Sequence, residues 1–546
     1  MFVRIKKKDE NRWHIQIVES VRVRDEVKQK IIRSIGVARS PQEVEQFKKI
    51  AEKAIIQIKN THQPVLAFED PEEVYAPKTR RKAVGDNVKL NDLREDRRII
   101  EGIQDVFGSV YRKMGAQQLI QGTDKDRQWN EILEACVLAR IAEPASKLAT
   151  SALLLRDFNM DVPVQKIYRM LDHLASHEYE AKKMVAAHTM ETIGGKVSLA
   201  FFDVTTLYFE SIEQDELRSF GFSKDCKFKE TQVVLALLAT EDGLPITYEL
   251  FPGKTFEGHT LLTVAKNLKE KYGLTDVTLV ADRGMFNEAN LSLMEAEGFH
   301  YVVAAKLKSM SKGIKQAIQS NEFRPLVANN EFSWVYETQH KSRRVIVNYS
   351  NDRARKDKAD RQRLVDRLLK KVRDKTVALK DVIGNSGTKK YLKLTGKTAD
   401  IDQDKIEQDG EWDGIHGIIT NMKDASAASL LERYRGLWQI EESFRINKHT
   451  LKMRPIYHWS SRRIKAHISL CFLSYATCRY AQLSLKYAGL KESVESIRSE
   501  LNNVQSSVLV DKASGKSYGL PSAMTDKAKA IYRAFKLKRD LSPYEI

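Results

Sequence analysis

Two aspartates and one glutamate, far apart in the chain, are the residues whose types best fit metal-assisted chemistry. Asp203 and Asp282 lie at polar breaks of apolar, β-rich runs, and Glu441 lies in the segment YRGLWQIEESFRINK. Two divalent ions about 3.5–4 Å apart need a cluster of carboxylates, and Mg²⁺ prefers such oxygen ligands. One ion would activate water or a 3′-hydroxyl, and the other would stabilise the leaving oxygen. We therefore expect the three carboxylates to converge.

Each carboxylate taken alone also has an ordinary structural explanation. Asp203 could cap a turn at the end of a strand, and the Arg-Gly pair that follows Asp282 is typical of a turn. Glu442, whose side chain points about 100° away from that of Glu441 on a helix, is the alternative candidate for the metal-binding glutamate. Only the joint pattern of the three residues favours a metal site.

The segment 434–448 is predicted to form one helix, because its apolar residues recur at helical spacing and it has no Pro. Tyr434, Glu441, Arg445 and Lys448 follow one another at offsets of 7, 4 and 3 residues, which places them near one helix face. The two cations would hold phosphates, and Tyr434 would hydrogen-bond a phosphate or stack on a base. A solvated helix with ion pairs would show the same pattern.

Trp438 lies in the same predicted helix. Its ring could stack on an extruded base. At helical spacing, however, a tryptophan more often packs in a core, and the sequence favours that second interpretation.

Five apolar, β-rich runs are predicted to carry the aspartates on one sheet. They cover residues 197–210, 232–240, 245–253, 277–286 and 300–307, and the second and third are joined by a turn with an Asp-Gly pair. The order is a three-stranded meander followed by strand, helix and strand. This order predicts a mixed α/β sheet with helices on its faces.

Changes in composition and in hydrophobic pattern divide the chain into six regions. A charged stretch with its own predicted hairpin and long helix interrupts the sheet pattern, which resumes with the strand 415–421. The N-terminal strands alternate apolar and basic residues and predict an antiparallel hairpin, either a DNA-binding module or a solvated sheet face. The regions are 1–95 (basic strands, a helix at 41–60 and a linker), 96–195 (helical), 196–307 (first part of the carboxylate-bearing core), 308–412 (inserted subdomain), 413–490 (second part of the core) and 491–546 (C-terminal tail).

Composition restricts the possible partners and compartments. The 546 residues carry a formal net charge of +18, which favours an anionic partner such as nucleic acid, although many lysines can also simply keep a protein dispersed. The four cysteines include no CxxC pair, so neither a zinc site nor a disulfide framework is expected. No signal peptide and no apolar run of about 18 residues is apparent, so we expect a bacterial cytoplasmic protein without a membrane span.

These motifs together resemble the DDE transposases of bacterial insertion sequences, in particular the IS-four superfamily with its Tyr-x2-Arg-x3-Glu-x6-Lys signature. The signature falls on Tyr434, Leu437, Glu441 and Lys448, so a leucine occupies the arginine position and Arg435 is the nearby arginine that could compensate. FFDVTTLYFE and LVADRGMF resemble the two aspartate strands of the family, which also has an insertion before the glutamate helix. RIAEPASKLAT and the N-terminal strands are similar to one branch of the group. The resemblance covers roughly residues 120–490.

The resemblance implies an α/β fold with a ribonuclease-H-like core and an inserted, partly β subdomain. Asp203, Asp282 and Glu441 would bind two Mg²⁺ ions, or Mn²⁺ in their place. The DNA-binding residues would be Tyr434, Arg435, Trp438, Arg445 and Lys448. The enzyme would bind the terminal inverted repeats of its element in double-stranded DNA, cut them and join the 3′-hydroxyl ends to target DNA. Relatives cut the second strand through a DNA hairpin, and pairing of two ends implies a homodimer.

Two other functions stay open at this point. A metal-dependent nuclease with the same core would cut DNA without joining it. A transposase derivative that had lost catalysis would only bind DNA. Terminal inverted repeats on either side of the reading frame would favour a mobile element.

Overall fold

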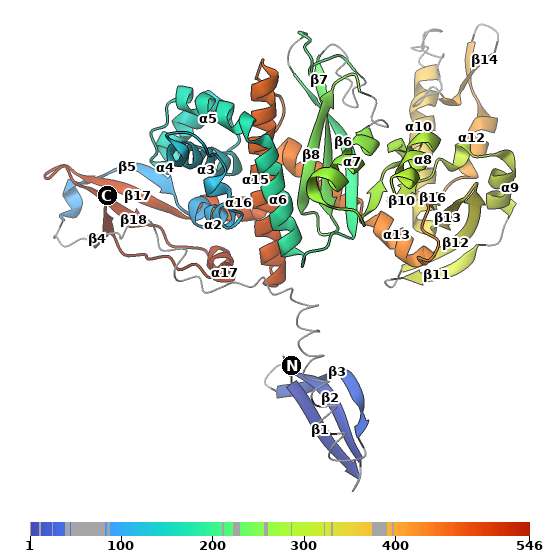
Figure 1. Cartoon of the computed structure of the whole chain (residues 1–546), viewed down its shortest axis with the longest axis horizontal. Helices are drawn as coiled ribbons and strands as arrows, with labels where there is room; N and C mark the ends of the chain where they lie inside the picture. Colours follow the sequence, from blue (N-terminus) through green and yellow to red (C-terminus); the bar gives the residue numbers. More distant parts are fainter. Residues whose placement is uncertain are drawn as a thin grey trace.

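The computed structural model shows an elongated arrangement of a helical region and a large sheet, with a small N-terminal sheet (Figure 1). The structure describes residues 2–9, 12–23, 26–38, 44, 48, 82–83, 88–209, 212–221, 230–255, 260–285, 287–320, 323–328, 331–373, 390–395 and 398–546. Most of the predicted helix 41–60, apart from residues 44 and 48, and most of the connection 61–95 lie outside these residues. Within the part that is described, no helix is both long and apolar enough to cross a lipid bilayer.

Five strands of the central sheet form the predicted core. They are β6 (Leu199–Tyr208), β7 (Gln232–Thr240), β8 (Pro245–Pro252), β9 (Thr278–Ala281) and β10 (His300–Ala304), and they lie in the order β8-β7-β6-β9-β10. The first three pair antiparallel, whereas β9 runs parallel to both β6 and β10. This is the ribonuclease-H-like arrangement, and it confirms the predicted fold class.

The core strands are apolar on both faces because both faces are covered. Phe201 belongs to one hydrophobic core and its neighbour Phe202 to the other. The core around Phe202 includes residues of α7 (Thr260–Tyr272) and α8 (Glu288–Ala296). The core around Phe201 continues into the helical region, so the sheet and the helices share one interior.

The inserted segment extends this sheet. Its predicted hairpin is present as β12 (Glu331–His340) and β13 (Arg343–Tyr349), with β11 (Arg324–Ala328) beside it and α9 (Lys312–Ser320) before it. β13 pairs with β16 (Ile415–Thr420), and β16 pairs with β10, which makes nine strands among the described residues. The rest of the insertion contains α10 (Asn351–Arg373), β14 (Leu392–Thr395), β15 (Thr398–Ile401) and α12 (Gln403–Gly410).

The helical region contains the helices that the sequence predicts. They are α3 (Asp126–Ala142), α4 (Lys147–Phe158), α5 (Val164–Ser176) and α6 (Glu178–Thr192). Ser146 caps α4 by accepting a hydrogen bond from the amide of Ala149 at 3.2 Å. The long helix α15 (Ser461–Tyr487) runs beside α6, between the other helices and strands β7 and β8 (Figure 1).

A second sheet joins residues from the two ends of the chain. Its order is β4-β19-β18-β17-β5, formed by β4 (Lys82–Ala83), β5 (Leu93–Ile100), β17 (Gln505–Asp511), β18 (Ser517–Pro521) and β19 (Tyr544–Glu545). β5 lies across the boundary between the predicted linker (61–95) and the predicted helical region (96–195), so both predictions are wrong at residues 93–100, and the predicted tail 491–546 contains regular helices and strands. The charged sequence LREDRR hides the strand period of β5, and the tail also contains α16 (Val494–Asn502) and α17 (Asp526–Ala534).

The N-terminal residues form their own antiparallel sheet, of β1 (Phe2–Asp9), β2 (Arg12–Val23) and β3 (Glu26–Ala38). This confirms the predicted short strands of residues 1–37 and their antiparallel pairing. Ile15 and Val18 are buried in it.

Candidate active site

Asp203 and Asp282 lie side by side on neighbouring strands. The parallel register pairs Phe202 of β6 with Ala281 of β9, so the next pair in line is Asp203 and Asp282. Adjacent strands lie about 4.8 Å apart. Asp203 is in the middle of β6, so its predicted placement at a strand end was wrong, whereas Asp282 directly follows β9 as predicted.

The two aspartates share one face of the sheet. Phe201 and Val280, one residue pair back from Phe202 and Ala281, belong to the core that includes Ile440 and Phe444. Because side chains alternate along a strand, Asp203 and Asp282 are directed toward this same face. The face that carries the aspartates is therefore the one on which the glutamate segment packs.

The segment 434–448 is not the single helix that the sequence predicts. Residues before Gly436 form α13 (Ala427–Arg435), and those after it form α14 (Trp438–Arg445) and a π-helical turn, Ile446–Thr450. A Cβ atom at Gly436 would overlap the ring of Phe201. Glycine thus allows the chain to approach β6 closely where α13 gives way to α14, and it brings Glu441 toward the strand of Asp203.

A cleft of about 1120 Å³ opens beside this junction. It is bordered by the ends of β9 and β10, by α10 and α12 of the insertion, and by α13 and α14. Among the described residues, those of the predicted site that line the cleft are Asp282, Tyr434, Arg435, Trp438 and Glu441, and those that do not are Asp203, Arg445 and Lys448. The predicted grouping on one helix face is therefore correct only in part.

The two cations beyond Glu441 turn away from the cleft. Arg445 donates to Glu442 on its own helix, with an Nη2–Oε1 distance of 2.6 Å. The Nζ atom of Lys448 lies 6.0 Å from the ring centroid of Phe444. Trp438 is 57% exposed at the cleft, so the prediction of a core tryptophan was wrong and its ring face is accessible.

Tyr434 forms an aromatic pair with His416, with ring centroids 5.0 Å apart. Burial raises the pKa of Tyr434 to about 12, and the charge of Asp282 adds to this shift. Burial also lowers the pKa of His416 to about 4, assisted by the charge of Arg353. Both side chains are therefore neutral at pH 7, and the Tyr434 hydroxyl keeps its proton.

The cleft has a basic wall of which only Arg435 was predicted from the sequence. The basic residues that line it are Arg283, Lys306, Lys308, Arg353, Arg361, Lys390 and Arg435. Part of this charge is neutralised locally, because Asp409 accepts from Lys308 at 2.9 Å and from Lys390 at 2.6 Å. The high charge of α10 was visible in the sequence, but nothing there indicated that this helix borders the carboxylates.

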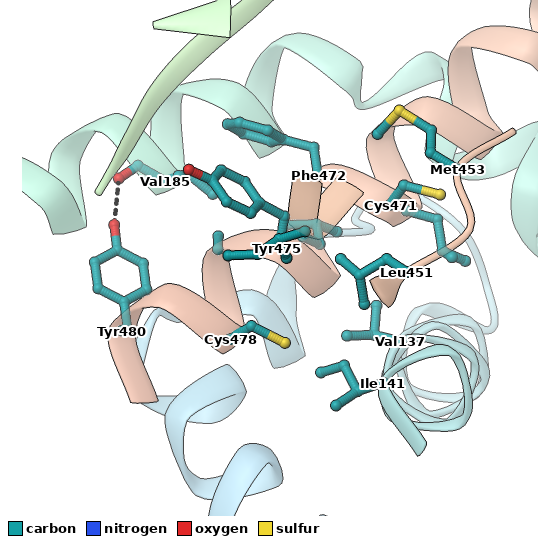
Figure 2. Close-up of a cluster of buried hydrophobic side chains, with 14 of the residues drawn as sticks. Val137, Ile141, Val185, Leu451, Met453, Cys471, Phe472, Tyr475, Cys478 and Tyr480 are labelled. Atoms are coloured by element: carbon teal, nitrogen blue, oxygen red, sulfur yellow. Dashed lines mark hydrogen bonds between the residues drawn. The ribbon is translucent and has the colours of Figure 1, made fainter. Parts of the chain in front are cut away.

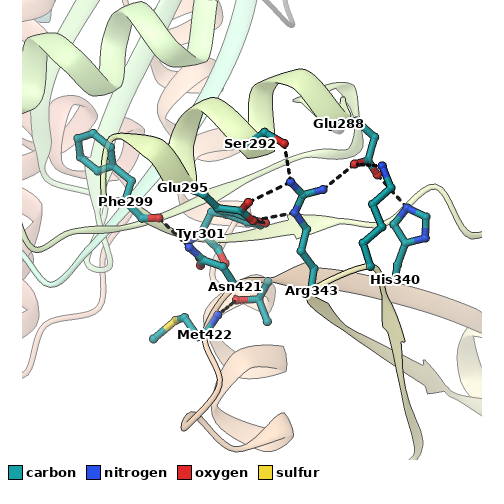
Figure 3. Close-up of polar contacts among 11 residues, drawn as sticks. Glu288, Ser292, Glu295, Phe299, Tyr301, His340, Arg343, Asn421 and Met422 are labelled. Atoms are coloured by element: carbon teal, nitrogen blue, oxygen red, sulfur yellow. Dashed lines mark hydrogen bonds and ion pairs between the residues drawn. The ribbon is translucent and has the colours of Figure 1, made fainter.

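A salt-bridged network fixes the segment that follows Asp282 (Figure 3). Arg343 of β13 is only 3% exposed and lies 2.7 Å from Glu288 and 2.7 Å from Glu295, both on α8. Tyr301 of β10 donates to Glu295 at 2.6 Å. These bonds hold α8 against the sheet and therefore position the turn between Asp282 and α8.

The donor chemistry of the three carboxylates suits Mg²⁺, but they are not gathered into a preformed cluster. Within the described residues, no group of three or more His, Cys, Asp or Glu side chains has the spacing of a metal site. Carboxylates repel one another when no cation neutralises them. The two aspartates are adjacent by register, and Glu441 borders the same cleft as Asp282.

Comparison with known proteins identifies the family. A family model described as "Transposase DDE domain" matches residues 196–477, and one described as "IS1634 family transposase, N-terminal domain" matches residues 2–63. No curated protein matches the chain. Among solved structures, the piggyBac transposase synaptic complex with hairpin DNA is 8% identical, over 74% of this chain and 77% of that chain, with a TM-score of 0.38. The Mos1 transposase paired-end complex with the left transposon end is 14% identical, over 33% of this chain and 60% of that chain, with a TM-score of 0.15. Because the first model matches more than half of the sequence, the chain belongs to the family of DDE transposases, enzymes that cleave and join DNA with divalent metal ions.

Proposed function

We propose that this DNA transposase uses Asp203, Asp282 and Glu441 to hold two Mg²⁺ ions, with Mn²⁺ as a substitute, while it cuts the ends of an insertion sequence and joins them to target DNA. The observation that supports this most is the parallel register of β6 and β9, which aligns the two aspartates on the face that α14 covers. When bound, the ions would activate the attacking hydroxyl and stabilise the leaving oxygen.

The residues of α13 and α14 would orient the DNA. Arg435 is exposed at the cleft and would contact a phosphate. The neutral hydroxyl of Tyr434 would donate a hydrogen bond to a phosphate oxygen. The exposed ring of Trp438 would stack on a base beside the cut. Arg445 and Lys448 lie outside the cleft and would contact the DNA farther along.

The substrate is double-stranded DNA that carries the terminal inverted repeats of the element. Two ends must be held together for coordinated joining, so we propose a homodimer in the DNA-bound complex. The enzyme would act on the nucleoid in the bacterial cytoplasm.

The decisive experiment uses a labelled fragment with the terminal repeat that flanks the reading frame, a supercoiled target and Mg²⁺. Wild type should yield nicked ends and joined products. Asp203→Ala, Asp282→Ala and Glu441→Ala should each lose about a thousandfold or more in cleavage rate, since each removes a metal ligand worth several kcal/mol. End binding in EDTA should stay within about twofold of wild type, because the phosphate contacts remain.

Glu442→Ala is the matched control, because Glu442 neighbours Glu441 but pairs with Arg445. It should cleave nearly as fast as wild type. Normal nicking by any of the three carboxylate variants would reject the assignment. Nicking by wild type without joining would instead identify a nuclease, and binding without metal-dependent cutting would identify an inactive DNA-binding derivative.

A further inference from the structure

A short segment between the π-helical turn and α15 exposes two aromatic rings that the proposed mechanism does not use. Exposure alternates along it: Ile456 and His458 are buried, whereas Tyr457 is 63% and Trp459 is 64% exposed. This alternation places the side chains of Tyr457 and Trp459 on the solvent side of the segment. The two rings are therefore neighbours on one surface.

The segment is anchored from behind, so the rings are held in place. The ring of His458 lies 6.2 Å from Tyr168 and 5.3 Å from His467. His467 donates a hydrogen bond to the carbonyl of Met453 at 3.1 Å, and Arg140 donates to the carbonyl of Leu451 at 2.8 Å. A surface that is ordered before it binds loses less entropy on binding.

A buried cation lies against Trp459. The guanidinium carbon of Arg218 is 6.0 Å from the Trp459 ring centroid and 5.8 Å from that of Phe209. Arg218 is only 5% exposed and pairs with Asp215 at 2.8 Å. Its Nη1 atom is buried and has no hydrogen-bond partner among the described residues. An unpaired buried donor is uncommon in a folded protein, and this one lies on the cation that flanks the exposed Trp459 ring.

The surface next to the rings is suited to a phosphate. Trp459 is followed by Ser460, the N-cap of α15, and the first turn of this fully described helix carries arginines and no acid. Arg462 is exposed there and donates to the carbonyl of Asp172 at 2.8 Å, while Arg463 forms an ion pair with the Asp172 carboxylate at 3.0 Å. The partial positive charge of a long helix at its N-terminus attracts an anion. The guanidinium carbon of Arg454 adds a cation 5.2 Å from the ring centroid of Tyr208, at the end of the strand that carries Asp203.

We propose that Tyr457 and Trp459 form a stacking platform for unpaired DNA nucleotides, with a backbone phosphate near Arg462 at the start of α15. A base can lie flat on a ring only when it has left the duplex stack, so the ligand is single-stranded DNA. The combination of exposed rings and cations favours this partner over an apolar protein surface. The proposal rests on the proposed function, because it names the state of the DNA held beside the same core.

The test measures binding of full-length protein in EDTA to two fluorescein-labelled probes, a 20-nucleotide oligo(dT) and a 20-base-pair duplex of random sequence. Trp459→Ala should weaken oligo(dT) binding about tenfold, the effect of losing one stacked base, and change duplex binding less than about twofold. Trp459→Phe should restore most of the affinity. Tyr179→Ala, which removes another exposed aromatic on α6, is the matched control and should bind like wild type.

A second measurement needs no variant. Photo-crosslinking of wild type to oligo(dT) that contains 5-iodouracil should give adducts on Tyr457 or Trp459. Equal losses for both probes, unchanged oligo(dT) binding, or adducts only elsewhere would overturn the platform. Metal is absent from both assays, so their failure leaves the cleavage test intact, and failure of the carboxylate assignment leaves these assays interpretable.

Discussion

Helices α14 and α15 follow each other in the chain but differ in almost every physical respect. α14 has eight residues and exposes Trp438, Glu441 and Arg445. α15 has 27 residues and is buried almost continuously from Ile464 to Leu485, so it is enclosed by the protein on all sides. In Figure 2, Phe472, Tyr475 and Cys478 of α15 lie in one cluster with Val137 and Ile141 of α3. The short helix α14 exposes polar and aromatic side chains, whereas the long helix α15 packs in the core.

The polar side chains of the two helices also differ in whether they are hydrogen-bonded inside the protein or accessible at the cleft. On α15 they are used internally: Ser469 bonds to Tyr248 at 2.7 Å, and Tyr475 donates to Ser443 of α14 at 2.6 Å. Tyr480 donates to the carbonyl of Val185 at 3.1 Å. On α14 the side chains of Trp438 and Glu441 instead face the cleft. Satisfied polar groups stabilise a fold, whereas accessible ones remain available to a substrate.

The largest expected difference concerns an aromatic side chain on each helix. Phe472→Ala should lower the free energy of unfolding by about 3–5 kcal/mol, because it leaves a cavity against Tyr248 in the core. Trp438→Ala should change it by only about 0.5 kcal/mol, since its ring is exposed, yet it should weaken DNA binding. Urea unfolding of both variants checks this. Similar losses of stability would break the contrast between the helices.

The next effect concerns the connection between the helices. Arg479 of α15 donates to the carbonyl of Gly243 at 2.9 Å and to Gln439 of α14 at 3.2 Å. Arg479→Met should lower stability by about 2–3 kcal/mol, because it removes charge-assisted bonds to groups that stay buried. It should also slow cleavage at unchanged DNA affinity, as α14 loses a support. Gln482→Ala is the control, because it removes an Arg479 partner within α15 itself, at 2.6 Å, and leaves the Arg479 bonds to Gly243 and Gln439 in place; it should leave the cleavage rate as in wild type.

A pH effect of intermediate size comes from Lys147, which packs against α15 with its Nζ atom 3.4 Å from His467. Burial, assisted by the charge of Arg140, lowers the pKa of Lys147 to about 7, against about 10.4 in an unfolded chain. Between pH 7 and pH 10.4 the unfolded chain binds one more proton than the folded chain. The free energy of unfolding therefore rises with pH in this range, by at most about 1.4 kcal/mol per pH unit. Lys147→Met should have a higher free energy of unfolding than wild type at pH 7.5, and this difference should become smaller toward pH 9.5. Urea titrations of both proteins at pH 7.5 and pH 9.5 measure the difference. A difference that does not change with pH would contradict a neutral buried lysine.

The smallest effect is on salt dependence. Lys448→Ala, just beyond α14, should reduce the slope of log affinity against log salt by about 0.9 if it neutralises one phosphate. Lys486→Ala near the end of α15 should leave the slope unchanged, since Lys486 pairs with Asp242 at 2.9 Å. Titrations of duplex DNA at several salt concentrations compare the two. Equal slopes for both variants would remove Lys448 from the DNA-binding surface.

The sequence predicted the sheet well because its signals are local. The apolar runs of β6, β7 and β9 and the Asp-Gly turn identify strands without knowledge of their neighbours. The register of β6 with β9, which aligns Asp203 with Asp282, depends on packing between distant segments. It could be expected from the resemblance but not calculated from the pattern.

The predictions that were wrong have a common physical cause, namely contacts between residues far apart in the sequence. Position 436, where α13 gives way to α14, lies against the ring of Phe201, more than 200 positions away, which leaves no room for a side chain there. The basic residues Arg353 and Arg361 of α10 line the cleft beside Trp438 only because the insertion folds back toward α14. The strand β5 is too charged to show a period, and its partner β17 lies near the other end of the chain. Local patterns carry no information on such contacts.

The pairing of β5 with β17 also sets an order of events during synthesis. Residues 93–100 leave the ribosome about 400 residues before residues 505–511 do. At about 5–20 residues per second, this delay amounts to roughly 20–80 s. Throughout that time β5 lacks its partner, and the two strands pair only after residues 505–511 emerge. A nascent chain can therefore form its central nine-stranded sheet before the sheet that contains β5, and we expect the exposed edge of β5 to be the site at which chaperones or aggregation act first.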